Sequence, residues 1–412
     1  MKEYKLSQLL EIKNGKDHKE LPDGEYPVFG SGGVMRFVNE YLYDKPSILL
    51  PRKGSLDNIQ YCDVPFWTVD TSYYTVVNEE LANPYFLYRY LKLLDLSRLD
   101  SGTGVPSMTF DSYYGIKVLL PEIEEQKRIA SVLQKLDTKI KLNCQINDNL
   151  EAMAKLLYDY WFVQFDFPNE EGKPYKSSGG AMVWNEKLKR EIPQGWSGVS
   201  LKDLALTSRN AITPVENEVY QHFSIPSFDA CGSYSLDNGS DIKSDKFVLQ
   251  KGRLLVSKLN PWFNRVVWVP KGTNMIGSTE FVVLNPNNES ESGYIYSVIK
   301  SPKFIAYCSQ AATGTSHSQR RVSPDVLMAF KVVYEQGVVQ KYGCLIEKIQ
   351  KQQAELLSEI AILTKQRDEL LPLLMNGQAT VNYHLSSTPT TAFGMINKAS
   401  TGIIGTAKFD MD

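Results

Sequence analysis

The stretch PEIEEQKRIASVLQKLDTKIKLNCQINDNLEAMAKLLYDYWFV, residues 121–163, decides the fold of this 412-residue chain. The acidic residues after Pro121 suit a helix N-terminus, where unpaired N–H groups favour negative charge. Seam positions then recur in steps of four and three, with two asparagines among them, at Ile129, Leu133, Leu136, Ile140, Asn143, Asn147, Leu150, Ala154 and Leu157. This heptad spacing predicts a helix with an apolar seam, and about 40 residues make it about 60 Å long.

A second stretch, residues 336–378, repeats the pattern, with seam positions at Ile346, Ile349, Gln353, Leu356, Ile360, Leu363, Arg367, Leu370 and Leu374. A small domain cannot bury either seam along its whole length. A globular segment separates the two helices, so we predict that they pair antiparallel within one chain. Pairing with another copy of the chain is the alternative. The polar seam residues Asn143, Asn147, Gln353 and Arg367 are expected to fix the register.

The second helix is expected to end at Pro372 and Gly377. The remaining chain falls into two similar blocks, rich in Tyr, Gly and Val with frequent turn signals, which favours short strands with some helix. We therefore predict an α+β fold with a pseudo-twofold internal repeat. Two globular α/β domains are joined by two long antiparallel helices that form an intramolecular coiled coil. The predicted segments are a first domain (1–121), a first spacer helix (122–165), a linker (166–195), a second domain (196–335), a second spacer helix (336–378) and a flexible tail (379–412).

Composition excludes several classes of protein. Hydrophobic residues make up 42% and charged residues 22% of the chain, as in globular proteins. The net charge of −2 argues against a globally basic nucleic-acid coat, but it permits local basic loops. The five cysteines form no C-x-x-C pair and the four histidines are scattered, so neither a disulfide framework nor a metal site is indicated. No apolar run is long enough to span a bilayer, and we expect a soluble, cytoplasmic protein.

Two segments invite a methyltransferase interpretation. Asn83-Pro84-Tyr85-Phe86 and Asn260-Pro261-Trp262-Phe263 resemble the N-P-P-[YF] loop that grips a flipped base, but an aromatic residue replaces the second proline. The glycine-rich stretch 29–33 precedes a strand-like segment, whereas an anion-binding glycine turn leads into a helix. We therefore predict that the chain is not an enzyme and has no catalytic, cofactor-binding or metal-binding residues.

Several loops place cations beside glycines, amides and hydroxyls. Arginine side chains read guanine and asparagine reads adenine, while hydroxyls and backbone amides position phosphates. Ordinary solvated loops are the alternative for each segment. The predicted DNA-binding residues are Arg52, Lys53, Thr103, Gly104, Lys258, Asn260, Arg265, Thr313, Gly314, Arg320 and Arg321.

An aromatic cluster ends the first helix. Its members, Tyr158, Tyr160, Trp161 and Phe162, are residue types that anchor protein interfaces. We predict that they bind a partner protein. Packing against the linker or a globular domain is the alternative.

Several segments, in the right order, resemble the specificity subunit of type I restriction–modification systems. Leu120-Pro121-Glu122-Ile123-Glu124-Glu125-Gln126 resembles the family's L-P-P-x-x-E-Q helix start, with Glu122 in place of the second proline. The stretches 150–168, 192–196 and 371–378 resemble the end of the first helix, the start of the second recognition domain and the C-terminal end of the family. The start of the second helix, at residues 335–340, lacks the P-P-x-x-E-Q form.

The resemblance implies two target-recognition domains that each read one half of a bipartite site in double-stranded DNA, with the paired helices as a ruler. It also implies two modification (methyltransferase) subunits and restriction/translocase subunits as partners, and no membrane. S-adenosylmethionine, ATP and Mg would bind these partners, and no cofactor would bind this chain. A self-contained adenine DNA methyltransferase and a structural coiled-coil adaptor without a DNA role are the alternatives.

Overall fold

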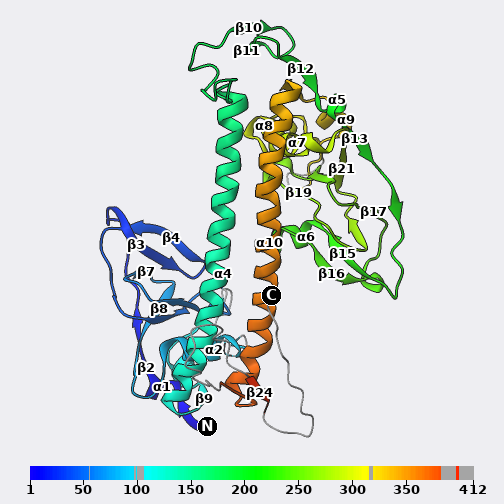
Figure 1. Ribbon diagram of the computed structural model, residues 1–412. Coiled ribbons are helices and arrows are strands. Elements are labelled where there is room, and N and C mark those ends of the chain that lie inside the picture. Colours follow the sequence, from blue (N-terminus) through cyan, green and yellow to red (C-terminus); the bar gives the residue numbers. More distant parts are fainter. Residues whose placement is uncertain (55, 97–98, 100–105, 315–318, 382–395, 399–412) are drawn as a thin grey trace, which may run out of the picture. The chain divides into compact units, whose positions relative to one another are not determined.

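The computed structural model describes residues 1–54, 56–96, 99, 106–314, 319–381 and 396–398. The chain divides into two compact units, Met1–Lys141 with Ala361–Asp412, and Leu142–Ile360. Each unit holds one globular domain and one stretch of each of two long helices, α4 (Ile123–Tyr158) and α10 (Gln336–Met375) (Figure 1).

Polar side chains connect α4 and α10 in both units. In the second unit, Asn143 Nδ2 donates to Glu359 Oε2 at 2.7 Å, and Gln353 Nε2 lies 3.3 Å from Asn147 Oδ1. In the first unit, Arg367 Nη1 lies 3.1 Å from Asp137 Oδ1. Residue numbers fall along α10 as they rise along α4, so the helices run antiparallel. The predicted intramolecular pairing is confirmed, and each of the four polar seam residues contacts the opposite helix.

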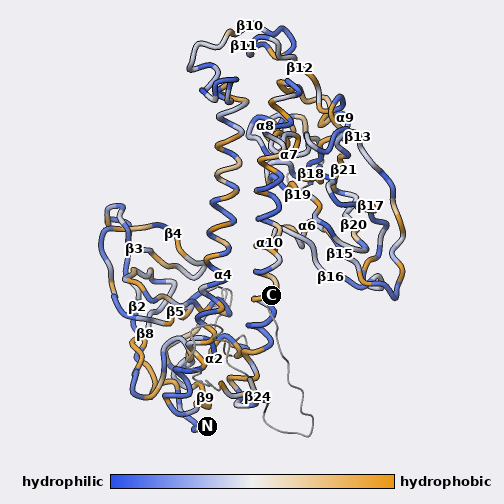
Figure 2. The backbone as a smooth tube through the Cα atoms, in the orientation of Figure 1, coloured by the Kyte–Doolittle hydropathy of each residue, from blue (hydrophilic) through white to orange (hydrophobic). Residues whose placement is uncertain are grey.

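Apolar residues of both helices continue into the cores of the globular domains. Ile129 and Leu133 of α4 and Leu371 of α10 are buried in the core of the first domain. Ala154 of α4 and Ile346 of α10 are buried in that of the second. Figure 2 shows apolar and polar residues alternating along both helices. The helices therefore belong to the two cores as well as to each other.

Helix α10 begins at Gln336 and ends at Met375, within the predicted segment 336–378. At its start, Glu335 Oε2 accepts a hydrogen bond from Val338 N at 2.7 Å, which caps the helix where the family's motif is missing. The helix continues past Pro372 to Met375, because Leu374 and Met375 are buried in the core of the first domain. Gly377, with φ +69°, then ends it, as a left-handed residue after a helix does.

The first globular domain is built on two sheets. The larger has the antiparallel strand order β2 (Leu10–Asn14), β8 (Ser72–Val77), β5 (Ser47–Pro51) and β6 (Gln60–Cys62). In the smaller, β3 (Asp23–Gly30) pairs antiparallel with β4 (Gly33–Val38) and parallel with β7 (Trp67–Thr68). The glycine-rich stretch is thus a hairpin turn between strands, not a strand-to-helix turn. The other elements are β1 (Lys2–Lys5), paired with β9 (Lys117–Leu120), and helices α1 (Leu6–Leu9), α2 (Pro84–Lys92) and α3 (Phe110–Tyr114).

The second domain repeats this topology. Its antiparallel sheet has the order β13 (Ala205–Ser208), β21 (Phe281–Pro286), β18 (Leu254–Ser257) and β19 (Val266–Trp268). In its five-stranded sheet, β15 (Val219–Phe223) again pairs antiparallel with β16 (Ser235–Asn238) and parallel with β20 (Met275–Gly277). Strands β17 (Lys246–Val248) and β14 (Ala211–Ile212) extend that sheet. The shared strand order confirms the predicted internal repeat.

The remaining elements of the second domain surround these sheets. Strand β12 (Ser197–Ser200) pairs with β22 (Lys331–Tyr334), as β1 pairs with β9 in the first domain. The helices are α5 (Leu201–Leu204), α6 (Ile225–Cys231), α7 (Ser292–Lys300), α8 (Pro302–Ala311) and α9 (Pro324–Met328), with short 3-10 turns η3 (Gly239–Asp241), η4 (Pro261–Phe263) and η5 (Glu289–Glu291).

Each globular domain is attached to a helix by a close contact. Gln126 of α4 is buried; its Nε2 donates to Leu81 O and Pro121 O, and its Oε1 accepts from Asn83 N at 2.9 Å. In the second domain, the start of α7 meets α10 backbone to backbone at two glycines. A Cβ on Gly343 would lie 1.9 Å from Ser290 O, and one on Gly293 would lie 2.6 Å from Gly343 O. Both contacts leave little freedom for a domain to shift along its helix.

The predicted linker and tail contain more structure than expected. Helix α4 continues into a π-helical turn, η2 (Asp159–Val163), and the linker forms a hairpin of β10 (Met182–Asn185) and β11 (Arg190–Pro193). Phe167 and Ile192 of this segment are buried in the second domain's core. In the tail, β23 (Ala379–Val381) pairs with β24 (Ile396–Lys398), and Ala379 is buried. The expected fraying is wrong for residues 379–381, because Ala379 and Val381 are buried in the core of the first domain.

We predict that Gly343→Ala destabilises the protein by about 1–3 kcal/mol or more, since the added methyl group collides with backbone rather than with a movable side chain. Gly337→Ala is the matched control on the same helix, where the nearest atom to the new Cβ is Glu335 Oε2 at 3.4 Å. That change should leave stability unaltered or raise it by up to about 1 kcal/mol through helix propensity. Denaturant unfolding measures both, and equal stability of the two variants would contradict the close α7–α10 contact.

Candidate nucleic-acid interface

In the second domain, two loops that the sequence analysis singled out are joined by backbone hydrogen bonds. Lys258 follows β18; its N–H donates to Glu280 O at 3.0 Å and its carbonyl accepts from Val322 N at 3.0 Å. Asn260 N donates to Arg320 O at 2.7 Å. Arg321 in turn exchanges two hydrogen bonds with Thr313, at 2.8 and 2.9 Å. The structure therefore brings together Lys258, Asn260, Thr313, Gly314, Arg320 and Arg321.

The first domain has the same backbone arrangement. Arg52 follows β5; its N–H donates to Thr71 O at 2.9 Å and its carbonyl accepts from Met108 N at 3.1 Å. Gly54 N donates to Pro106 O at 2.9 Å, and Lys53 forms a bridge with Ser107. Arg52 thus occupies the position of Lys258, so a cation follows the same strand in both domains. Thr103 and Gly104 lie outside the described residues.

Arg52 and Lys258, the two equivalent cations, are partly exposed, and the neighbouring Lys53 is exposed. Arg52 Nη1 lies 3.3 Å from Asp70 O, and its guanidinium lies 6.0 Å from the centroid of the Tyr73 ring. A side chain braced in this way keeps its charge at the surface, where it can meet a phosphate.

Arg265 does not fit the predicted DNA-binding role. Its side chain is buried, and its Nε and Nη2 donate to the two carboxylate oxygens of Asp229 at 2.6 and 2.8 Å. This hydrogen bonding lowers the pKa of Asp229. The predicted role is therefore corrected, because the buried Arg265 guanidinium is held in a bidentate ion pair with the half-exposed Asp229 and is not free to contact DNA.

The two adjacent arginines have different surroundings. Arg320 Nη2 donates to Ala312 O at 2.5 Å, and its backbone N–H donates to Asn260 Oδ1 at 3.0 Å. Arg320 thus braces the loops. Arg321 is exposed and pairs with Glu280 at 3.0 Å, an interaction that raises the pKa of Arg321. Because exposed pairs contribute little free energy, Arg321 can exchange Glu280 for a phosphate or a base.

Gly314 permits the close approach of the two strands of this loop. A Cβ at residue 314 would lie 2.6 Å from Gln319 O and 3.0 Å from Arg320 Cα, in both cases backbone atoms. Thr313 and Gly314 are themselves exposed. Glycine is therefore needed here for packing of the loop, whatever DNA contact its backbone makes.

Two exposed aromatic residues in the same loop were not among the predicted DNA-binding residues. Trp262 and Phe263 are 40% and 56% exposed and form the tip between Asn260 and Asn264. The surrounding segment was predicted to bind DNA through Lys258, Asn260 and Arg265, and the two rings were weighed only as part of a methyltransferase motif. The sequence does place these two large aromatic rings between two asparagines. Because asparagine tolerates the left-handed conformation of tight turns, this pattern indicates a surface turn that carries both rings.

The aromatic cluster at the end of α4 is placed differently from the prediction. Trp161 and Phe162 are 7% and 1% exposed and belong to the second domain's core. Phe162 packs 4.6 Å from Tyr294 and 5.0 Å from Tyr342, centroid to centroid. Tyr158 also packs against these rings, and only Tyr160 is exposed, at 37%. As a group they cannot anchor a partner, because their apolar surface is already buried between the helices and the second domain.

An apolar stripe on α4 offers a better partner surface. Four residues on one face of the helix are 44–68% exposed, namely Leu142, Ile146, Met153 and Leu156. Exposed apolar patches of this kind mark interaction sites. Charged and polar residues would cover this face if it met only water.

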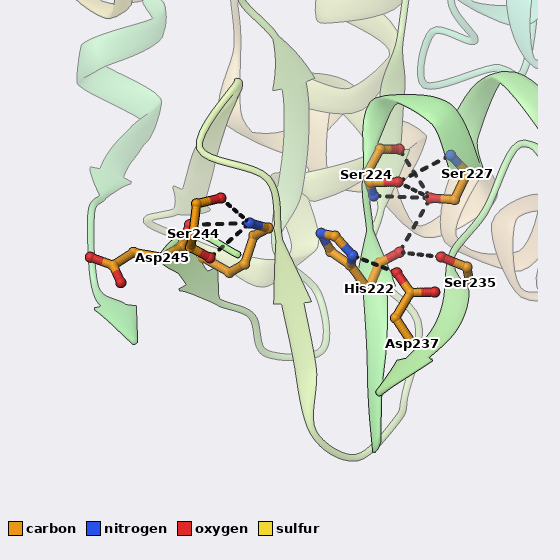
Figure 3. Close-up of polar contacts among 8 residues, drawn as sticks. His222, Ser224, Ser227, Ser235, Asp237, Ser244 and Asp245 are labelled. Atoms are coloured by element: carbon orange, nitrogen blue, oxygen red, sulfur yellow. Dashed lines mark hydrogen bonds and ion pairs between the residues drawn. The ribbon is translucent and has the colours of Figure 1, made fainter. Parts of the chain in front are cut away.

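A polar cluster in the five-stranded sheet resembles part of a catalytic triad but lacks its geometry (Figure 3). His222 Nδ1 lies 2.7 Å from Asp237 Oδ2. The neighbouring Ser227 Oγ donates to the backbone carbonyl of His222, and His222 Nε2 has no hydrogen-bond partner. A triad needs its hydroxyl on that nitrogen. The buried Lys246 donates to the backbone and hydroxyl oxygens of Ser244, so this cluster supports the sheet.

Among the residues that the structure describes, no group of three or more His, Cys, Asp or Glu side chains could hold a metal ion. No helix in the same residues is long and apolar enough to cross a membrane.

Comparison with known proteins gives consistent matches. Residues 1–152 match the family model of the type I restriction modification DNA specificity domain. The chain is 22% identical over 361 residues to the type I restriction enzyme MjaIX specificity subunit of Methanocaldococcus jannaschii, covering 82% of this chain and 79% of that protein. It is 36% identical over 114 residues to the HindI specificity subunit of Haemophilus influenzae, covering 25% and 24% of the two chains.

A solved structure shares the fold. The S subunit of a type I restriction–modification system from M. genitalium aligns with a TM-score of 0.61 at 18% identity, covering 90% of this chain and 95% of that one. At this identity the likeness concerns the fold alone.

We predict that Asp229→Ala lowers stability by about 1–3 kcal/mol, because it leaves the buried Arg265 guanidinium unpaired. Because the pKa of Asp229 is lowered in the folded state, the ion pair contributes fully to the free energy of unfolding above the ordinary aspartate pKa of about 4. This contribution is lost as the pH falls through the lowered pKa. Urea unfolding should show a difference in the free energy of unfolding between wild type and Asp229→Ala that is constant between about pH 5 and 8 and decreases at lower pH.

Glu216→Ala, which removes an exposed carboxylate from the same domain, should leave stability nearly unchanged. A difference between wild type and Asp229→Ala that does not change in acid would show that the pair does not depend on the aspartate charge.

Proposed function

We propose that this chain is a specificity subunit of a type I restriction–modification system. Each of its globular domains reads one half of a bipartite DNA site, through the loops joined at Arg52 in the first domain and at Lys258 in the second. The observation that carries the proposal is the repeated backbone arrangement. Arg52 follows β5 and Lys258 follows β18, the equivalent strand of the second domain. In both residues the backbone N–H donates to one loop, the backbone carbonyl accepts from another, and the side chain is positively charged. Two copies of one DNA-binding unit in one chain suit two half-sites.

The paired helices α4 and α10 supply the spacing between the half-sites. Both helices contribute to both units, and side-chain contacts between them define the register. A change in their length would change the number of unread base pairs. The subunit itself performs no catalysis; methyl transfer and cleavage belong to separate subunits.

Partner subunits complete the complex. The apolar stripe on α4, Leu142, Ile146, Met153 and Leu156, is our candidate docking surface for one of two methyltransferase subunits, in place of the aromatic cluster. S-adenosylmethionine would bind those subunits, and ATP and Mg the restriction/translocase subunits. The assembly would act in the cytoplasm, where DNA is accessible.

Mapping of methylated adenines across the host genome, with and without this chain, tests the proposal. Loss of methylation at one bipartite motif with a fixed unread spacer is the expected result. Loss at a short continuous motif would favour a self-contained methyltransferase, and no loss would favour an adaptor without a DNA role.

We predict that inserting seven residues at matching positions of α4 and α10 keeps both half-sites and lengthens the unread spacer. Seven residues add about 10 Å of helix, or up to about three base pairs. Methylation mapping of cells that carry the variant measures the spacer. Seven residues inserted in the turn between β10 and β11 should leave it unchanged, and an unaltered spacer after the helix insertions would exclude the ruler role.

We predict that Arg52→Ala and Lys258→Ala weaken DNA binding by the assembled complex without changing its motif. Each removes a phosphate contact, so each should reduce the slope of log affinity against log salt by about one. Fluorescence anisotropy over a salt series measures this slope.

Lys45→Ala and Lys251→Ala are matched controls for these two variants. Lys45 and Lys251 are exposed and lie before β5 and β18, the strands that Arg52 and Lys258 follow. Their loss should leave the slope unchanged. If Arg52→Ala and Lys258→Ala leave it unchanged as well, neither cation contacts a phosphate.

A further inference from the structure

We propose that Trp262 and Phe263 form an aromatic reading tip in the second recognition domain, which contacts thymine methyl groups in the major groove of its half-site. This inference rests on the proposed function and adds a specificity determinant to it. The tip is η4, Pro261–Phe263, together with the asparagines on either side.

The tip has a strained and well-braced backbone. Asn260 and Asn264 both adopt left-handed conformations, with φ of +48° and +49°. Phe263 N donates to Asn260 O and Asn264 N to Pro261 O, each at 3.1 Å. Left-handed residues other than glycine cost free energy and persist where surrounding contacts enforce them, often at functional sites. Two such residues around three others hold the rings in a defined place.

Two contacts lie beneath the tip. Pro261 is buried, and the Arg265 guanidinium lies 4.5 Å from the centroid of the Phe263 ring while it pairs with Asp229. The role of Arg265 is therefore to position the tip. The two rings remain 40% and 56% exposed, although burial would be favoured by their apolar area.

The tip is continuous with the candidate DNA interface, so DNA is the partner that we expect it to contact. Asn260 hydrogen-bonds Arg320 through both its backbone N–H and its side-chain Oδ1. Leu259 forms a bridge with Arg321, and Lys258 precedes it. A surface that meets DNA through Lys258 and Arg321 brings these rings to the same duplex.

The ring geometry favours contact through ring edges over stacking between bases. The Trp262 and Phe263 rings are 6.0 Å apart and inclined by 46°, so they cannot both lie parallel to stacked base pairs. One face of Phe263 is also covered by Arg265. Apolar side chains in the major groove recognise the thymine 5-methyl group, which suits exposed ring edges.

The first domain lacks an equivalent tip among its described residues. Gly54 of the first domain corresponds to Asn260 of the second. The stretch after Gly54 contains no exposed aromatic pair among its described residues: Leu56 is buried, and Asn58 Nδ2 donates to Ser31 O at 2.5 Å. The inference therefore concerns one half-site only, and the other half-site serves as an internal control.

The test replaces each thymine of the native site, one at a time, by deoxyuridine, which lacks only the methyl group. Binding is measured by anisotropy with the complete chain assembled with its methyltransferase subunits. Wild type should bind about fourfold more weakly for each contacted thymine replaced in the second half-site, the equivalent of one methyl group. The double variant Trp262→Ala, Phe263→Ala should bind thymine DNA more weakly and show no sensitivity to these replacements.

Trp184→Ala is the matched control, because Trp184 is 58% exposed but lies on β10 of the linker. It should retain full thymine sensitivity. Thermal unfolding of both variants should show a single folded protein well above the temperature of the binding measurement, so that lost thymine sensitivity is not caused by unfolding.

The outcomes separate the tip from the proposed function. If wild type prefers its bipartite site but is indifferent to every replacement in the second half-site, the tip is excluded and the function stands. Thymine sensitivity that persists in the double variant also excludes the tip. If wild type does not prefer its bipartite site over a scrambled duplex, both are overturned.

Discussion

The apolar seams of α4 and α10 impose the constraint on which the rest of the structure depends. Each seam is too long for its own domain to bury, so the two helices bury one another in an antiparallel pair, as the Asn143–Glu359 and Asp137–Arg367 contacts show. The seams also supply residues to both cores. Because of this, each domain is attached to the pair by buried contacts such as those of Gln126 and Gly343, and not by a flexible linker.

The recognition domains combine a constant backbone with variable side chains. The hydrogen bonds around Arg52 and Lys258 are equivalent in the two domains, but the residues that follow are Lys53-Gly54 in one and Leu259-Asn260 in the other. A constant cation suits the phosphate backbone, which is the same in every sequence. The side chains beyond it differ between the two domains on the same backbone arrangement.

The candidate site was predictable as a set of loops but not residue by residue. Lys258, Thr313 and Arg321 were recognised from their residue types, and the structure brings them together. Arg265 was assigned to DNA because its partner Asp229, 36 positions away, cannot be identified from local sequence. The aromatic cluster at Trp161 and Phe162 failed for the same reason, since burial depends on Tyr294 and Tyr342 from distant segments. Trp262 and Phe263 were overlooked because exposure also is a tertiary property.

The sequence by itself determined the two helices, their pairing and the internal repeat, because heptad spacing is a local periodic signal that dictates where apolar surface must lie. It also determined, through its missing motifs, that catalysis was a poor expectation for this chain. Only the tertiary structure decided which cations face solvent, which cations are paired and which aromatic rings remain exposed. These features depend on contacts between residues far apart in the chain, and no local pattern specifies which distant carboxylate or ring a given side chain will meet.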